Sequence, residues 1–235
     1  NYNDDLVISI FDNSSSNEIN NISDKFGCLY TRSANIGYGL GHNKNINIQS
    51  KNYQFESVVI LNPDVLISYE QIKSLILKLN IKDIIVSPNL LNPDHSQQDF
   101  IRKFPTIFSF FTRFFNLSKK FSYKYSKSKF QLVPFVHGAC YVVKLSSFKK
   151  FGLFDKRFFM YCEDLDLCRS ALMKGNGVYV DRTINVIHFH NRESKRSIKL
   201  FIIHMISIFK YFLKWGFFLD NNAKSINYLY KSESK

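Results

Sequence analysis

The stretch SVVILNPDVLISYEQIKSLILKLN, residues 57–80, decides the class of fold. Its first part, SVVILNPDV (57–65), is an apolar run that ends in a polar turn, which predicts a buried strand. The second part, SYEQIKSLILKLN (68–80), has apolar residues at helical spacing, and Ser68 is suited to cap the helix. DIIVSPNLL (83–91) then predicts another strand. This succession indicates an α/β protein with a mainly parallel central sheet flanked by helices.

The same alternation continues toward the N-terminus. LVISIF (6–11) predicts a strand that ends in the polar loop DNSSS, and CLYTRS (28–33) predicts a second, weaker strand. The glycine-rich NIGYGLGHN (35–43) follows as a loop, and we expect a helix from about Asn43 to Lys51.

Further elements are predicted toward the C-terminus. FVHGACYVVK (135–144) has strand character, and VYVDRTINVIHFH (178–190) predicts one or two strands. EDLDLCRSALMKG (163–175) between them predicts a helix with acids in its first turn and a glycine past its end.

The composition supports a large folded domain and points to an anionic partner. The 235 residues are 45% hydrophobic, which provides a core and excludes wholesale disorder. The formal net charge of +13 favours nucleic acid, an acidic lipid surface or a phosphorylated small molecule as partner. The four cysteines show neither a CxxC pair nor zinc spacing, which favours reduced thiols in the core of a cytosolic protein.

Two basic segments depart from the α/β pattern. Residues 102–129 are rich in lysine and aromatic residues and lack acids, so they could stack nucleic-acid bases, face a membrane as a lid, or be solvated lysines over packed phenylalanines. The tail SIKLFIIHMISIFKYFLKWGFFL (197–219) carries too many charges to span a bilayer comfortably and suits an interfacial helix, with docking on the catalytic domain as the alternative. We therefore divide the chain into a domain at 1–194 and an amphipathic basic helical region at 195–235.

Polar side chains at strand ends are candidates for a site. Asn62 and Asp64 follow a predicted strand and could hold a divalent cation through oxygen ligands, although Asn-Pro-Asp is also good turn chemistry. Asp12 and Asn13 could receive a nucleotide or simply cap their strand. The glycines of the 35–43 loop allow a close approach of the backbone to a ligand or a neighbouring strand.

The acids of EDLDLC raise a similar choice. Glu163, Asp164 and Asp166 suit the first turn of a helix because of the helix dipole. An acid beside the aromatic run that precedes them could instead have a raised proton affinity and act as a general base. His188 and His190 alternate on a predicted strand and can face one side, where they are candidate ligands or hydrogen-bonded structural residues.

The order of these motifs carries a resemblance. The series DNSSS, NIGYGLGHN, ILNPDV, RKFPT, HGACYVV, GLFDKRFFMYCEDLDLCRS and VIHFH resembles the family 2 glycosyltransferases. Within that family it looks most like bacterial rhamnosyltransferases of O-antigen and related surface-polysaccharide assembly. The resemblance implies a GT-A fold, a nucleotide-diphosphate-sugar donor and inversion at the anomeric carbon. The family normally begins with another strand and helix, so we expect the first βα unit to be absent here.

The resemblance also assigns roles to residues. Asp164 matches the catalytic base, with Glu163 beside it, and the helix dipole is expected to keep these acids ionised. Asp64 matches a metal-binding aspartate, and His188 matches a histidine that can complete the site for Mg²⁺ or Mn²⁺. The nucleotide-sugar site is assigned to the DN loop, the glycine-rich loop, the NPD turn and the HGA segment, through Asp12, Asn13, Asn35, Gly37, Asn43, Asn62, Gly138 and Ala139.

The resemblance implies a sugar transferase on the cytoplasmic face of the cell membrane. Its partners would be dTDP-rhamnose or another nucleotide sugar, a polyprenyl-diphosphate-linked oligosaccharide and the membrane surface, whose anionic charge suits the basic chain. Because the first βα unit is expected to be absent, a non-catalytic remnant that binds a nucleotide or a partner protein is the alternative. A basic nucleic-acid-binding module is a third hypothesis, which leaves the NPD turn, the acids and the histidine strand without a role.

Overall fold

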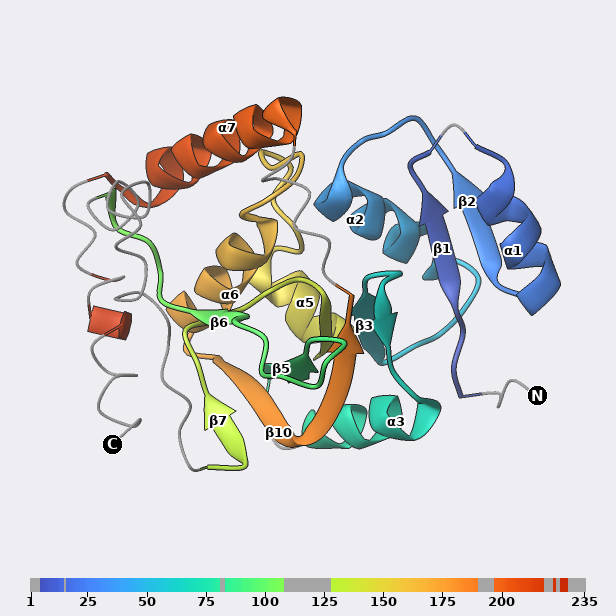
Figure 1. Ribbon diagram of the computed structural model, residues 1–235, viewed down its shortest axis with the longest axis horizontal. Coiled ribbons are helices and arrows are strands. Elements are labelled where there is room, and N and C mark those ends of the chain that lie inside the picture. Colours follow the sequence, from blue (N-terminus) through green and yellow to red (C-terminus); the bar gives the residue numbers. More distant parts are fainter. Residues whose placement is uncertain are drawn as a thin grey trace.

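The computed structural model shows a mixed α/β protein (Figure 1). It describes residues 5–14, 16–80, 83–107, 128–189, 197–217, 222 and 225–227. Most of the basic segment 102–129 and the histidine at 190 therefore lie outside the described residues.

A six-stranded sheet forms the centre of the molecule. Its order is β3 (Ser57–Leu61), β9 (Cys140–Lys144), β5 (Ile84–Leu91), β10 (Gly177–His188) and β4 (Val65–Leu66), and β7 (Phe130–Leu132) also pairs with β10. β5 and β10 are parallel, whereas β9 runs antiparallel to both β3 and β5. The predicted α/β class with a central sheet flanked by helices is confirmed. The expectation that this sheet is mainly parallel was wrong, because β4, β7 and β9 run antiparallel to the strands they pair with. Hydrophobic patterns carry no information on strand direction.

Helices pack on this sheet through apolar side chains. α3 (Tyr69–Lys78) begins where predicted, since Ser68 and Gln71 form a capping box. Leu75 of α3, Phe148 of α5 (Leu145–Phe151) and Leu167 of α6 (Glu163–Met173) are fully buried in one core with the strands. α6 thus starts directly at the predicted acid cluster, and the core fixes its position.

The N-terminal elements form a second, smaller sheet. β1 (Ser9–Asp12) and β2 (Leu29–Arg32) are parallel, and α1 (Glu18–Phe26) connects them. α2 (Tyr38–Gln49) packs against β1. In Figure 1 these elements lie at one end of the molecule, and α6 and α7 lie toward the other.

The predicted start of α2 at Asn43 was wrong. The helix begins five residues earlier, inside the glycine-rich stretch. A Cβ at Gly39 would lie 2.8 Å from Cβ of Phe154, and one at Gly41 would lie 3.0 Å from the ring of Phe11. These glycines allow the helix to pack closely, so here they serve a helix rather than a loop.

The strand expected at 135–144 is divided in two. β8 (Phe135–Val136) pairs with β6 (Ile101–Arg102), and β9 begins at Cys140. The turn between them contains Gly138, which the candidate site uses. Of the stretch 178–190, residues 178–188 lie in the single strand β10, whose register shifts between Asp181 and Asn185.

The C-terminal helix α7 (Ile198–Trp215) begins at the N-cap Ser197 and packs beside α6. Ile208, Tyr211 and Phe212 bury its inner face in the main core. Within the described part of the chain, no helix is long and apolar enough to cross a membrane.

Candidate active site

The NPD turn after β3 brings a carboxylate next to a histidine. Oδ1 of Asp64 lies 3.4 Å from Nε2 of His188, which is only 3% exposed at the end of β10. The backbone fixes this pairing, because the amide of Phe189 donates to the carbonyl of Asp64 at 2.9 Å. On its other side, Nδ1 of His188 lies 2.7 Å from Oε1 of Gln98, which orients the imidazole. Gln98 was not predicted from the sequence.

Two further observations bear on a cation at this turn. Oδ1 of Asn62 and Oδ1 of Asp64 are buried and have no hydrogen-bond partner among the described residues. Oxygen acceptors in that state suit a hard divalent cation. The described residues contain no group of three His, Cys, Asp or Glu side chains that could hold a metal alone. A cation at this turn would need further ligands, such as water or oxygen atoms of a bound molecule.

Asp164 is held at the start of α6 by two backbone amides. Its Oδ2 accepts from the amide of Gly138 at 2.9 Å, and its Oδ1 accepts from the amide of Leu165 at 2.7 Å. Burial raises the pKa of Asp164 above its ordinary value, although these two bonds and the charge of Arg102 oppose the rise. The carboxylate is thus both oriented and made more basic, as a general base requires.

Glu163 is more deeply buried than its neighbour Asp164, and the two side chains differ in charge. The residue is 7% exposed, and its Oε2 has no hydrogen-bond partner among the described residues. Burial, and next the charge of Asp164, raise the pKa of Glu163 to about 8. The expectation that the helix dipole keeps both acids ionised is therefore wrong for Glu163, which is mostly protonated at neutral pH, because desolvation outweighs the dipole.

The raised pKa of Glu163 predicts a loss of stability as pH rises from about 4.5 to about 8. The folded chain keeps this proton up to about pH 8, whereas the ordinary pKa is 4.5, so the folded state binds more protons between these values. The free energy of unfolding therefore falls as pH rises through this window, by up to about 5 kcal/mol for Glu163. Urea unfolding from pH 5 to pH 9 measures it. Glu163→Gln should remove most of the fall, and the exposed Glu70→Gln in α3 should leave it unchanged.

The predicted nucleotide side of the site is built on β1. The carboxylate of Asp12 accepts from the hydroxyl of Tyr30 at 2.7 Å and from the amide of Ser14 at 2.7 Å. Burial raises the pKa of Asp12, but the hydrogen bonds from Tyr30 and Ser14 lower it by more. The pKa of Asp12 therefore lies below its ordinary value. Asp12 is therefore an ionised acceptor at the carboxyl end of a parallel strand, where ligands of α/β sheets bind.

The polar residues of the glycine-rich stretch hold the backbone. Oδ1 of Asn13 accepts from the amide of Ile36 at 3.3 Å, and its Nδ2 donates to the carbonyl of Gly37 at 3.3 Å. Oδ1 of Asn35 accepts from the amide of Gly37 at 3.0 Å. Gly37 has φ +92°, and a Cβ there would lie 2.1 Å from the carbonyl oxygen of Phe159. Only glycine therefore fits at this point.

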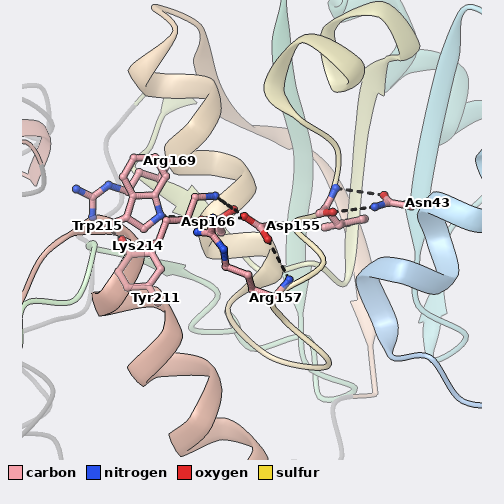
Figure 2. A network of polar contacts seen from close by, with 9 residues as sticks. Asn43, Asp155, Arg157, Asp166, Arg169, Tyr211, Lys214 and Trp215 are labelled. Carbon is pink, nitrogen blue, oxygen red and sulfur yellow. Dashed lines mark hydrogen bonds and ion pairs between the residues drawn. The ribbon is translucent and has the colours of Figure 1, made fainter.

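Asn43, one of the predicted donor-site residues, bonds to the backbone of the protein. Its Nδ2 donates to the carbonyl of Phe154 at 2.7 Å, and its Oδ1 accepts from the amide of Phe154 at 3.1 Å (Figure 2). The side chain joins α2 to the loop after α5. These two bonds to Phe154 show how Asn43 supports the site. A contact between Asn43 and the donor stays a prediction.

Gly138 is the point at which the separate motifs meet. Its amide binds Asp164, and its carbonyl accepts from the hydroxyl of Tyr38 at 2.6 Å. The carbonyl of the next residue, Ala139, accepts from the amide of Asn62 at 2.8 Å. The acids of α6, the glycine-rich stretch and the NPD turn are therefore linked through two residues. Tyr38 was missed in the sequence, because its role depends on contacts across 100 positions of the chain.

The chain has relatives among the curated proteins, although no protein-family profile matches it. It is 26% identical over 200 residues to rhamnosyltransferase WbbL of Escherichia coli K12, covering 81% of this chain and 76% of WbbL. It is 28% identical over 181 residues to the low-salt glycan biosynthesis hexosyltransferase Agl10 of Haloferax volcanii. That match covers 76% of this chain and 57% of Agl10.

A solved structure has the same fold. The crystal structure of GalNAc-T7 with UDP, GalNAc and Mn²⁺ matches with a TM-score of 0.58 and 12% sequence identity, over 78% of this chain and 38% of that chain. This likeness concerns the fold alone. Taken together, the sequence relatives and the fold identify the chain as a homologue of glycosyltransferases with a GT-A fold.

Proposed function

We propose that the chain is an inverting, metal-dependent transferase that moves rhamnose from dTDP-rhamnose to a polyprenyl-diphosphate-linked oligosaccharide, in the synthesis of O-antigen or a related polysaccharide. The observation that carries the proposal is the convergence at Gly138 and Ala139, through which Asp164 and the NPD turn are joined. The choice of rhamnose rests on the similarity to WbbL, which is named a rhamnosyltransferase.

The residues of the NPD turn fit a divalent cation. Asp64, His188 and Asn62 would hold Mg²⁺ or Mn²⁺ together with diphosphate oxygens of the donor, which agrees with the buried acceptor oxygens described above. When bound, the cation would neutralise charge on the departing nucleoside diphosphate. Mn²⁺ is also present with UDP in the GalNAc-T7 structure, which supports a divalent ion in this fold.

Asp164 is the proposed base. It accepts the proton of the acceptor hydroxyl as that oxygen forms a bond to the anomeric carbon and the bond from this carbon to the diphosphate oxygen breaks. Attack opposite the leaving group inverts the configuration. Glu163, protonated beside it, adds no second negative charge where the acceptor oxygen becomes negative. The proposed donor-binding surface consists of Asp12, Asn13, Asn35, Gly37, Gly138 and Ala139. Asn43 supports this surface through its hydrogen bonds to the backbone of Phe154.

A transfer assay tests this function. The chain is incubated with dTDP-rhamnose labelled in the sugar, Mn²⁺ and membranes that contain lipid-linked oligosaccharides. We expect label in the lipid fraction with the anomeric configuration opposite to that of the donor. Label that appears only from another nucleotide sugar would overturn rhamnose but keep the transferase. A folded chain that transfers no sugar would favour the non-catalytic remnant.

We also propose that α7 lies on the cytoplasmic face of an anionic membrane, where the lipid-linked acceptor is found. Its outward face is apolar and solvent-exposed, and it forms a shallow groove lined by Ile202, Met205, Ile206, Phe209, Lys210 and Leu213. Lys199 and Lys210 lie about three turns apart on one side of this face, and Lys210 also donates to the carbonyl of Arg157. An apolar stripe with flanking lysines matches an anionic bilayer surface better than a neutral protein partner.

Vesicle binding checks the role of α7. We expect the chain to co-sediment with vesicles containing phosphatidylglycerol and to bind phosphatidylcholine vesicles at least about tenfold more weakly. Ile206→Glu should reduce binding about tenfold, because a charge replaces buried apolar surface at the interface. Leu77→Glu is the matched control, because this leucine of α3 is also exposed (64%, against 48% for Ile206), and it should bind like the wild type. Equal vesicle binding by both variants would refute the assignment of α7 to the membrane. If Ile206→Glu instead abolished a dimer, self-association through α7 would replace that assignment.

A further inference from the structure

The backbone just before the catalytic acids is strained. Tyr161 and Cys162, which directly precede Glu163, have φ of 69° and 68°, in the left-handed region that side chains other than glycine rarely adopt. Such a conformation persists only where its surroundings hold it. The segment 155–162 must therefore be held from outside for Asp164 to stay at Gly138.

Side chains of α7 supply three contacts to this segment. Nζ of Lys214 lies 2.8 Å from Oδ2 of Asp155, at the beginning of the segment. Nζ of Lys210 donates to the carbonyl of Arg157 at 2.8 Å, and the hydroxyl of Ser207 donates to the carbonyl of Met160 at 2.7 Å. These three donors stand one turn apart on the helix, so α7 follows the segment along its length.

The same helix also binds α6, two residues after the proposed base. Nζ of Lys214 donates to Oδ2 of Asp166 at 2.7 Å, and the indole nitrogen of Trp215 donates to Oδ1 of Asp166 at 2.6 Å. Asp166 is 2% exposed, so this carboxylate depends on these partners for its charge. Figure 2 shows the cluster, in which the ammonium group of Lys214 binds both Asp155 and Asp166.

Contacts between Arg169 of α6 and two aromatic side chains hold the end of α7 against α6. The guanidinium of Arg169 lies 4.4 Å from the ring centroid of Trp215 and donates to the hydroxyl of Tyr211 at 2.8 Å. On the opposite side of the segment, the carbonyl of Phe159 accepts from the amide of Tyr38. The strained segment is thus held between α7 and the helix that reaches Gly138.

We propose that Lys214 is a positioning residue for the transfer reaction. By bridging Asp155 and Asp166, its ammonium group joins both ends of the stretch that contains Tyr161, Cys162 and Asp164. It does not touch the reacting atoms, and it acts by keeping the carboxylate of Asp164 on the amide of Gly138. The inference rests on the transferase function proposed above. It adds that α7, beyond any contact with lipid, is a required part of the catalytic centre.

The test compares Lys214→Met with the wild-type chain. We expect kcat to fall about 30-fold while KM for the donor stays within about twofold, since the donor side of the site does not contact Lys214. Lys214→Arg should recover most of kcat. Trp215→Phe keeps a ring over Arg169 but loses the bond to Asp166, and it should lower kcat about fivefold. This milder variant keeps the test valid if Lys214→Met folds poorly.

Leu75→Ala is the control for lost stability, because it opens a cavity in α3 outside the network and should leave kcat unchanged once folded. Hydrogen exchange gives a readout independent of activity. Amides of residues 155–166 should exchange at least about tenfold faster in Lys214→Met, without the same change in α3. Unchanged exchange there, or kcat within twofold of wild type in both network variants, would overturn the positioning role. If the wild type transfers no sugar but the exchange result holds, the function fails and the structural role of Lys214 stands.

Discussion

Asp164→Asn should lower kcat for sugar transfer about 10³-fold, the size expected for removal of a general base. The amide is nearly isosteric, but only its oxygen can accept, so one of the two bonds from the amides of Gly138 and Leu165 is kept. Donor affinity should change little, because the substitution removes the proton acceptor and one hydrogen bond on the side of the acceptor hydroxyl. Steady-state kinetics with dTDP-rhamnose, together with donor binding by calorimetry, separate these effects.

The matched control is Asp24→Asn, an exposed aspartate of α1 that should leave kcat unchanged. A transfer rate in Asp164→Asn within tenfold of the wild type would remove Asp164 from the role of base. Glu163 would then be the next candidate, and its pKa of about 8 predicts that activity would rise with pH through that value.

Asp64→Ala should abolish metal-dependent binding of the donor. The substitution removes the carboxylate that faces His188 and leaves one imidazole and one amide at the turn, which is too few ligands for Mg²⁺ or Mn²⁺. We expect the affinity for Mn²⁺ to fall at least about 100-fold. Loss of the signal of free Mn²⁺ in electron paramagnetic resonance measures binding without reference to activity.

The chain itself offers a close control for this variant. Leu-Asn-Pro-Asp occurs a second time at residues 91–94, where Asp94 is exposed and accepts from Ser96 instead of facing a histidine. Asp94→Ala should bind Mn²⁺ like the wild type. If both variants bound the ion equally well, the metal would lie elsewhere or bind without specificity.

The repeated tetrapeptide also shows what local sequence could predict. The sequence analysis predicted a turn at the first copy, and the structure has a turn at both copies. Local sequence cannot distinguish them, because the difference is the approach of His188, 124 residues further along the chain, beside Asp64 only. The order of the motifs along the chain, rather than the tetrapeptide alone, supported the assignment of the first copy to the metal site.

Hydrophobic periodicity and capping residues predicted the start of two of the helices that flank the sheet. Ser68 capped α3 as expected, and α6 began at Glu163. The start of α2 was mispredicted because Gly39 and Gly41 suggested a loop, whereas close packing on Phe154 and Phe11 favours a helix there. Tertiary packing decided a case in which intrinsic propensity pointed the other way.

The charge state of the acids could not be predicted from position alone. The first turn of a helix favours ionised carboxylates, but Glu163 is enclosed by the core and has Asp164 as its neighbour. The contacts of Lys214 were equally out of reach, since they join residues 48 and 59 positions apart. The contacts that hold a site in place depend on the assembled fold more than the sequence motifs of the site do.

The most direct test of the central claim is calorimetric titration of dTDP-rhamnose into the chain, with Mn²⁺ present and then absent. The proposed donor site at Asp64 and Gly138 predicts saturable binding with Mn²⁺ that is at least about tenfold weaker without it and is lost in Asp64→Ala. A folded chain that bound neither dTDP-rhamnose nor any other nucleotide sugar, with or without Mn²⁺, would contradict the account.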